Sequence, residues 1–113
     1  MAILTKRIYD DPAPSDGFRI LVDRLWPRGV TKERAALGLW LKEIAPSTEL
    51  RTWFHAHPDA FDEFAARYRA ELRTNPAVDE LRRIERANPT VTLLYSVKDP
   101  AQNHAVILAD YLG

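Results

Sequence analysis

One segment near the carboxyl end limits most strongly what this chain can fold into. The run TVTLLYSV at positions 90–97 is nearly continuously apolar. Such a run is typical of a strand that is buried on both faces, as in a parallel sheet covered by helices. Two further strand-like runs lie near the amino end, at positions 3–9 and 18–25. The sequence therefore predicts an α/β fold with a small three-stranded, mostly parallel sheet.

A long helical block separates the second and third predicted strands. Four apolar residues between positions 37 and 44 follow the i, i+3, i+4, i+7 spacing of one helix face, which predicts a helix over about 32–44. We expect about five helices in all: this one, one capped by Ser47, one after Pro58, one after Pro76, and a last one over 99–112. Such a long crossover favours parallel pairing of the strands that it joins. The shorter link between the first two strands permits either direction, and we favour the parallel one.

Length and composition restrict the class of protein. A chain of 113 residues is expected to form one domain over its whole length. Its 16 Lys and Arg residues balance its 16 Asp and Glu residues, which argues against a surface that grips nucleic acid throughout. The absence of cysteine excludes disulfides, thiolate nucleophiles and cysteine-based zinc sites. No run resembles a signal peptide or a membrane-spanning helix, so we expect a cytoplasmic protein with no membrane partner.

Charged and aromatic side chains gather where the predicted strands end. The segment DGFRILVDRLWPRG at 16–29 passes from an apolar strand directly into such residues, and the segment 98–104 supplies more after the third strand. Because the carboxyl ends of parallel strands meet at one edge of a sheet, we expect a ligand site there. The predicted ligand-binding residues are Arg7, Asp23, Arg24, Trp26, Arg28, Asp99, Asn103 and His104.

These side chains suit an anionic ligand. The planar guanidinium groups of Arg24 and Arg28 could clamp an anion, and Trp26 could stack on a flat ring. Backbone amides at the start of the last helix would add positive potential. His104 is the best candidate for proton transfer near neutral pH, and Asp23 is the second candidate catalytic residue.

A purely structural interpretation of the same residues stays open. Asp23 could pair with Arg24 or Arg19 in a structural ion-pair network. Trp26 could close the end of the core, and Asp99 could serve only as a helix cap.

Two other patterns suggest a metal site and a nucleic-acid surface, but neither is well supported. The sequence HAHPD at 55–59 invites a metal interpretation, but histidines two residues apart on a helix point about 200° apart. We therefore expect no metal, and no feature predicts a cofactor. The arginines between positions 67 and 86 alternate with carboxylates, which is typical of a solvated, mutually paired helix face rather than of a nucleic-acid surface.

Several longer segments resemble the YeaO-like family of uncharacterised bacterial proteins. They are KRIYD at 6–10, DGFRILVDRLWPRG at 16–29, WLKEIAPS at 40–47, ELRTWFH at 49–55, RYRAEL at 67–72, TLLY at 92–95 and NHA at 103–105. The resemblance covers nearly the whole chain and implies an α/β fold. The family belongs to a larger group named only as a domain of unknown function, so the resemblance implies no established reaction.

Comparison with the longer relatives of that family sharpens the site. Their pattern carries an aspartate and a histidine that fall on Asp23 and His104 of this chain. Two cysteines of the same pattern fall on Tyr95 and Asn103, and a glutamate falls on Val97. The resemblance therefore implies that any thiol- or metal-dependent chemistry of those relatives does not extend to this chain.

We expect a small cytoplasmic protein that binds an anionic, nucleotide- or phosphate-like ligand at the carboxyl ends of its strands. The alternative is a non-catalytic module that docks a protein or a nucleic acid and has no small-molecule site. The sequence does not distinguish an enzyme from a binding protein, and it gives no oligomeric state.

Overall fold

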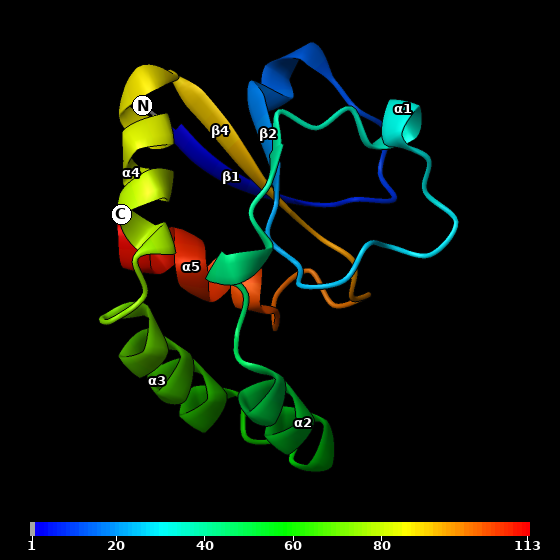
Figure 1. Cartoon of the computed structure of the whole chain (residues 1–113). Helices are drawn as coiled ribbons and strands as arrows, with labels where there is room; N and C mark the ends of the chain where they lie inside the picture. Colours follow the sequence, from blue (N-terminus) through cyan, green and yellow to red (C-terminus); the bar gives the residue numbers. More distant parts are fainter. Residues whose placement is uncertain (1) are drawn as a thin grey trace.

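The computed structural model describes residues 2–113 and contains a four-stranded parallel sheet with helices packed against it (Figure 1). The strands are β1 (Ala2–Arg7), β2 (Phe18–Leu21), β3 (Leu39–Trp40) and β4 (Thr90–Tyr95), in the order β1-β4-β2-β3. All three neighbouring pairs are parallel. The predicted α/β class and the parallel direction of the first strand are confirmed, whereas the predicted number of three strands is wrong.

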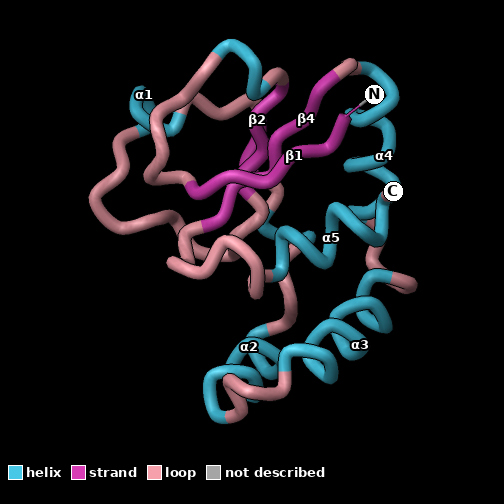
Figure 2. Tube along the Cα trace, turned by 180° about the vertical axis from the view of Figure 1, so that it is seen from behind, coloured by secondary structure: helices cyan, strands magenta, loops and turns pink. Residues whose placement is uncertain are grey.

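The described part of the chain contains five helices. They are α1 (Lys32–Ala35), α2 (Thr48–Ala56), α3 (Phe61–Leu72), α4 (Ala77–Ala87) and α5 (His104–Leu112). Helix α5 lies against β1 and β4, α3 packs on α5, and α2 packs on α3 (Figure 2). The predicted cap of α2 is confirmed, because the hydroxyl of Ser47 accepts a hydrogen bond from the Leu50 amide at 3.1 Å.

The helix predicted over 32–44 is wrong, and the missing strand lies inside it. Helix α1 ends after one turn, because Ala36 adopts a left-handed conformation with φ of 49°. The chain then forms β3, whose residues Leu39 and Trp40 pair with Ile20 and Leu21 of β2. A 3-10 turn over Lys42–Ile44 follows.

The apolar spacing that suggested a helix has another origin. Leu37 and Trp40 pack against a cluster on one face of the sheet, whereas Leu41 and Ile44 belong to the main core on the other face. An i, i+3, i+4, i+7 pattern arises here because the chain crosses the edge of the sheet and supplies apolar side chains to both faces. Periodicity alone does not separate this case from an amphipathic helix.

The core has two parts, one on each face of the sheet. The larger part lies between the sheet and the helices and includes Tyr68, whose hydroxyl donates a hydrogen bond to the Ile44 carbonyl at 2.6 Å. The smaller part consists of Ile8, Leu21, Val30, Ala35 and Leu94, with Trp26, Leu37 and Trp40 packed against it. Strand β4 lies between the two parts and is buried from its second residue to its last. This confirms the burial on both faces that its apolar run predicts.

A buried ionic cluster supports the smaller core. Asp16 lies 2.5 Å from the guanidinium of Arg19 and 3.1 Å from the ammonium of Lys6. Burial by itself would raise the pKa of Asp16, but the amide of Ala13 and the two cations outweigh that effect and lower the pKa below its ordinary 3.8. Arg19 also donates to the Ala35 carbonyl at 2.8 and 3.1 Å. Arg19 therefore pairs with Asp16, and the expected alternative in which it pairs with Asp23 is wrong.

The strands are shorter than predicted, and the last helix begins later. Strands β1, β2 and β4 end at residues 7, 21 and 95 rather than at 9, 25 and 97, and α5 begins at His104 rather than at position 99. Three connecting segments therefore meet at the carboxyl edge of the sheet: 8–13, 22–31 and 96–103. These segments carry most of the predicted site residues.

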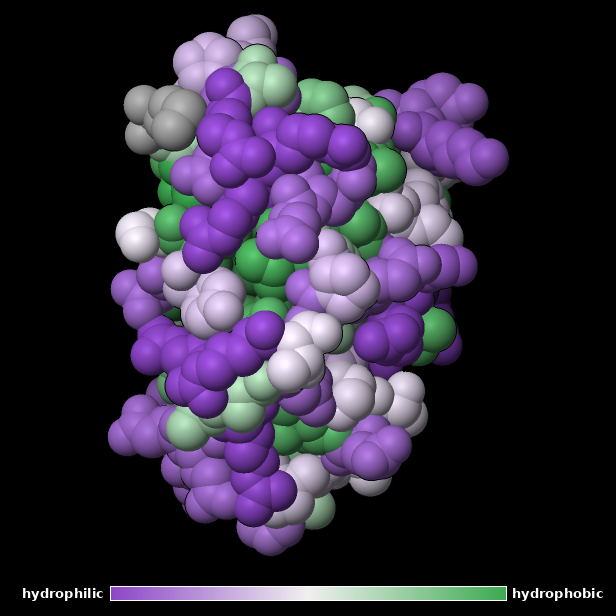
Figure 3. Space-filling view, turned by 60° about the vertical axis from the view of Figure 1, so that its left-hand side comes forward, coloured by the Kyte–Doolittle hydropathy of each residue, from purple (hydrophilic) through white to green (hydrophobic). Residues whose placement is uncertain are grey.

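The outer helices present a charged surface. Figure 3 shows the side of the molecule on which α4 lies, and hydrophilic side chains predominate there. Ion pairs join Arg67 to Glu63 along α3 and Arg83 to Glu80 along α4, as the alternating charges predict. Within residues 2–113, none of the helices combines the length and the apolar character needed to cross a membrane.

Candidate functional site

A cleft of about 600 Å³ opens at the carboxyl ends of the strands. This volume is within the range that small-molecule sites usually have. Seven of the eight predicted site residues line the cleft. They are Asp23, Arg24, Trp26, Arg28, Asp99, Asn103 and His104.

Arg7, the eighth predicted residue, does not line the cleft. Its guanidinium donates to the carbonyls of Val97 at 2.9 Å and Ser96 at 3.1 Å, and it lies over the ring of Tyr9. Arg7 therefore fixes the start of the segment 96–103 without lining the cleft itself. This segment forms one wall of the cleft.

Asp23 joins the end of β2 to the segment that follows β4. Its Oδ2 accepts hydrogen bonds from the amide of Ser96 at 3.0 Å and from the hydroxyl of Ser96 at 2.6 Å. Its backbone carbonyl accepts a hydrogen bond from the indole of Trp40 at 2.7 Å. Its Oδ1 is buried and accepts no hydrogen bond from the residues described, but it lies 3.3 Å from Nε2 of His104.

His104 is the first residue of α5, and its ring is almost enclosed. Nε2 lies 2.9 Å from the Val22 carbonyl, which can only accept, so Nε2 carries the proton. Burial lowers the pKa of His104 below 6.5, and the cation of Arg51 acts in the same direction, while Asp23 and the Val22 carbonyl oppose them. His104 is therefore a neutral imidazole at neutral pH, and its N–H is already in use.

Arg24 is anchored to backbone carbonyls rather than to a carboxylate. Its Nη2 donates to the carbonyls of Ala45 at 3.3 Å and Pro46 at 3.4 Å. Its Nε is buried and has no acceptor among residues 2–113. The ion pair between Arg24 and Asp23 that the structural interpretation suggested is not among the contacts of these residues.

Trp26 is held on both sides of its indole. The indole N–H donates to the Val30 carbonyl at 2.7 Å, and the ring meets Trp40 edge-on at 5.4 Å between centroids. Trp26 thus closes the smaller core, as the structural interpretation expected, and also lines the cleft.

Asp99 and Asn103 shape the turn before α5. Oδ1 of Asp99 accepts from the amides of Ala101 at 2.9 Å and Gln102 at 3.2 Å. Oδ1 of Asn103 accepts from the amide of Val106 at 3.0 Å, which makes Asn103 the N-cap of the helix. The helix cap is therefore Asn103, whereas Asp99 caps the turn that precedes it.

Three cations stand at the mouth of the cleft with their charge uncompensated. Arg28, Arg51 and Lys98 are exposed, and their side chains form no hydrogen bond or ion pair with any residue between 2 and 113. Both carboxylates of the cleft, Asp23 and Asp99, already accept internal hydrogen bonds. These carboxylates keep their charge, but the lining holds four cations, Arg24, Arg28, Arg51 and Lys98, so the cleft has an excess of positive charge although the whole chain has no net charge.

The wall formed by α2 and α3 was not predicted from the sequence. It contributes Arg51, Phe54, His55 and Phe64, with Pro46 beside them. Nothing in the local sequence marks these residues, because only the packing of α3 on α5 and of α2 on α3 brings them to the carboxyl edge of the sheet.

The two histidines of the HAHPD segment are not arranged as a metal site. The Nδ1 of His57 donates to the Trp53 carbonyl at 2.9 Å and its ring stacks on the indole, while His55 lines the cleft. No group of three or more potential ligands that could hold a metal ion occurs in the described part of the chain.

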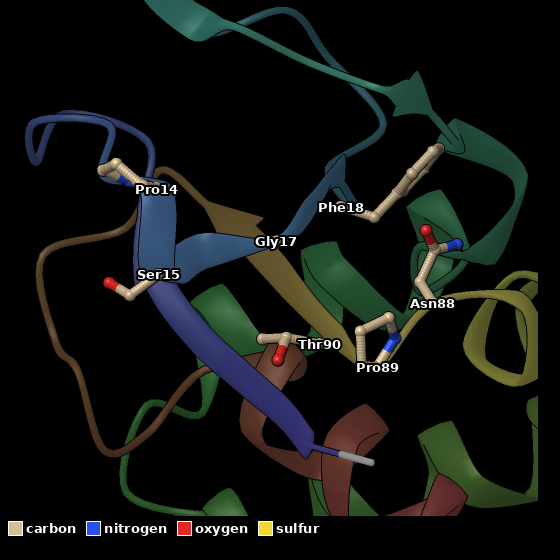
Figure 4. A pocket seen from close by; sticks show the side chains of 7 residues that line it. All are labelled: Pro14, Ser15, Gly17, Phe18, Asn88, Pro89 and Thr90. Atoms are coloured by element: carbon tan, nitrogen blue, oxygen red, sulfur yellow. The ribbon is translucent and has the colours of Figure 1, made fainter.

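A second hollow, of about 410 Å³, lies at the opposite ends of the strands (Figure 4). It is bounded by Gly17 and Phe18 at the start of β2 and by Pro89 and Thr90 at the start of β4. None of its lining residues is charged. It contains none of the predicted site residues.

The fold and the cleft define a small parallel α/β protein whose candidate site lies at the carboxyl ends of its strands. The chain belongs to the DUF488-N3i family, described as the inactive DUF488-N3 subclade, whose model matches residues 2–113. This membership and the relatives below confirm the resemblance to the YeaO-like family.

Curated relatives match almost the whole chain. The uncharacterized protein YeaO of Escherichia coli K12 is 50% identical over 113 residues, which cover 99% of this chain and 97% of that protein. Uncharacterized proteins of Mycobacterium tuberculosis H37Rv and Mycobacterium bovis are 45% identical over 107 residues, which cover 95% of this chain and 90% of each relative. No solved structure gives a significant match.

Proposed function

We propose that this protein binds a small anionic ligand, nucleotide- or phosphate-like, in the cleft at the carboxyl ends of its strands. One observation carries the proposal: Arg28, Arg51 and Lys98 have no partner within residues 2–113, and together with Arg24 they outnumber the two carboxylates of the cleft, Asp23 and Asp99. An anion placed among these cations therefore meets a net attraction.

The cleft geometry gives that attraction its strength. One exposed ion pair at 4 Å contributes only about 1 kcal/mol in water, but a partly enclosed pair contributes several times more. Arginine also offers a planar fork of donors that fits phosphate and carboxylate oxygens. Three cations around a cleft of about 600 Å³ thus favour a ligand of small-molecule size.

Binding accounts for the site better than catalysis does. The two candidate catalytic residues are engaged within the protein, since Asp23 accepts from Ser96 and the N–H of His104 donates to Val22. Asn103, at a position that carries cysteine in the pattern of the longer relatives, caps α5 here. The description of the matching family as an inactive subclade supports the same conclusion.

Titration with pyrophosphate, followed by calorimetry at low ionic strength, tests the proposal. We expect saturable binding that weakens by about tenfold or more when Arg28→Gln and Lys98→Gln are combined, because two ligand contacts are lost. Arg86→Gln changes the charge at an exposed arginine on α4, away from the cleft, and should leave the affinity unchanged. Undetectable binding, or equal affinity in the double variant, would contradict the proposal.

A further inference from the structure

Exposed apolar side chains are concentrated at the cleft. In the described part of the chain, the large hydrophobic side chains that stand exposed are Leu25 (62%), Val97 (47%), Leu4 (43%) and Tyr9 (39%). All of them except Leu4 line the cleft. Single exposed hydrophobic residues are normal on a protein surface, but a group around one concave site indicates an apolar contact with a ligand or partner.

The exposure of these side chains is fixed by the fold. Two backbone carbonyls next to the cleft, those of Ser96 and Val97, accept hydrogen bonds from Arg7. On the other side, the hydroxyl of Tyr9 donates to the Arg28 carbonyl at 3.0 Å. These hydrogen bonds fix the backbone of the segments that carry Leu25 and Val97. The exposure of the two side chains therefore follows from an ordered backbone.

Each of these segments pairs an apolar side chain with a cation. Val97 is followed directly by Lys98, and Leu25 lies three residues before Arg28. All four side chains line the same cleft. Cations alone would suffice for an inorganic anion. An apolar contact beside each cation instead fits a ligand in which a negative group is attached to a flat apolar body.

We propose that the cleft binds a phosphomonoester that carries an aromatic ring, such as a nucleoside monophosphate, and that the two segments hold it between them. The ring contacts Leu25 and Val97, and the phosphate lies among Arg28, Lys98 and Arg51. This inference rests on the proposed anion site and adds the chemical class of the ligand. The cations favour an anion of either kind, and the exposed Leu25 and Val97 favour an organic anion over a bare phosphate.

Two ligands that differ only in the base test this proposal: AMP and ribose 5-phosphate. We expect AMP to bind at least about tenfold more tightly to the wild-type protein, because ribose 5-phosphate has no ring to place on the apolar rim. The double variant Leu25→Ser, Val97→Ser should reduce this ratio to below about threefold and leave the affinity for ribose 5-phosphate unchanged. Both side chains are exposed, so the variant should keep the wild-type melting temperature, and Leu25→Ser alone serves if it does not.

Leu4→Ser is the matched control, because Leu4 is equally apolar and comparably exposed but lies on β1 outside the cleft. It should leave the ratio of the two affinities unchanged. Equal binding of AMP and ribose 5-phosphate by the wild-type protein, or an unchanged ratio in the serine variants, would overturn the proposed contact with the ring while leaving the anion site intact. Failure of AMP, ribose 5-phosphate and pyrophosphate alike to bind would overturn both proposals.

Discussion

Oδ1 of Asp23 lies 3.3 Å from Nε2 of His104, which brings the end of β2 against the first residue of α5. The same Nε2 donates its hydrogen bond to the Val22 carbonyl at 2.9 Å, while Oδ1 of Asp23 lies beside it without accepting one; both residues are more than 80 positions from His104 in the sequence. Ser96 holds the other carboxylate oxygen of Asp23. Asp23 and His104 therefore join the end of β2, the segment after β4 and the start of α5 at the cleft, which indicates a structural role for this pair.

The buried imidazole of His104 should make the stability of the protein depend on pH. Burial lowers the pKa of His104 in the folded state, so between pH 6.5 and that lower pKa the unfolded chain binds a proton that the folded chain does not. The free energy of unfolding should therefore fall as the pH is lowered from about 6.5, by at most about 1.4 kcal/mol per pH unit from this group.

Urea unfolding of the wild-type protein and of His104→Gln at several pH values between 5 and 7.5 measures this effect. Glutamine can still donate to the Val22 carbonyl but does not titrate, so the variant should show the smaller decrease toward acid. An equal decrease in both proteins would show that the imidazole contributes nothing to the acid sensitivity.

The carboxylate of Asp16 should be more important for stability than its position in a connecting segment suggests. Replacement by Asn leaves the guanidinium of Arg19, which is only 5% exposed, without its counter-charge. Breaking a buried ion pair in this way costs about 3–5 kcal/mol, and we expect the lower end because Lys6 remains partly exposed. Asp11→Asn is the control, since the side chain of Asp11 is 98% exposed and its pair with Arg34 should contribute less than about 1 kcal/mol. Chemical denaturation of both variants compares the two losses.

The same carboxylate gives a second acid transition. Because the folded-state pKa of Asp16 is below 3.8, its contribution to stability is complete above that pH and is lost as the pH falls through the lower folded value. Asp16→Asn should therefore differ from the wild-type protein most above pH 4 and least at the acid extreme. A difference that stays constant with pH would contradict the assignment of the charge as the source of stability.

Substitutions at Gly17 and Gly29 distinguish two effects of adding a side chain: backbone strain at positive φ and steric overlap with a neighbouring strand. Both have positive φ, 64° and 77°, where residues other than glycine are strained by about 1 kcal/mol or more. A Cβ at Gly17 would also lie 2.3 Å from the Thr90 carbonyl oxygen, at the start of β4, whereas a Cβ at Gly29 would meet nothing within 4 Å. Gly17→Ala should thus lower the melting temperature clearly more than Gly29→Ala. Equal losses would mean that the approach of β2 to β4 is less tight than the structure shows.

The elements that were predicted correctly are those with a clear signal in their own local sequence. The apolar run of β4 indicates burial on both faces, and the cap at Ser47 is a hydrogen bond to a residue three positions later, so both can be recognised from the local sequence. Strand β3 forms by pairing with Ile20 and Leu21 of β2, and its two residues are too few to show an alternation of apolar and polar side chains. A strand of this length is defined by its neighbour and not by its composition.

The site divides in the same way. Asp23 follows the end of β2, His104 begins α5, and Arg28 lies in the segment after β2, so topology alone could place all three at the carboxyl edge. Arg51 and the aromatic residues of α2 and α3 reach the cleft only because α2 packs on α3 and α3 packs on α5, for which the sequence gives no local signal.

Arg7 tests the difference between holding the cleft in shape and contacting its ligand. Arg7→Gln removes the two hydrogen bonds to the carbonyls of Ser96 and Val97, so we expect the segment 96–103 to loosen and AMP to bind several-fold more weakly. Hydrogen exchange of the amides in that segment should become faster in this variant. Arg28→Gln should also weaken AMP binding but leave that exchange at the wild-type rate, because its side chain braces nothing within residues 2–113. Loss of AMP affinity in Arg7→Gln without faster exchange would instead place the Arg7 guanidinium in contact with the ligand, as the sequence alone suggested.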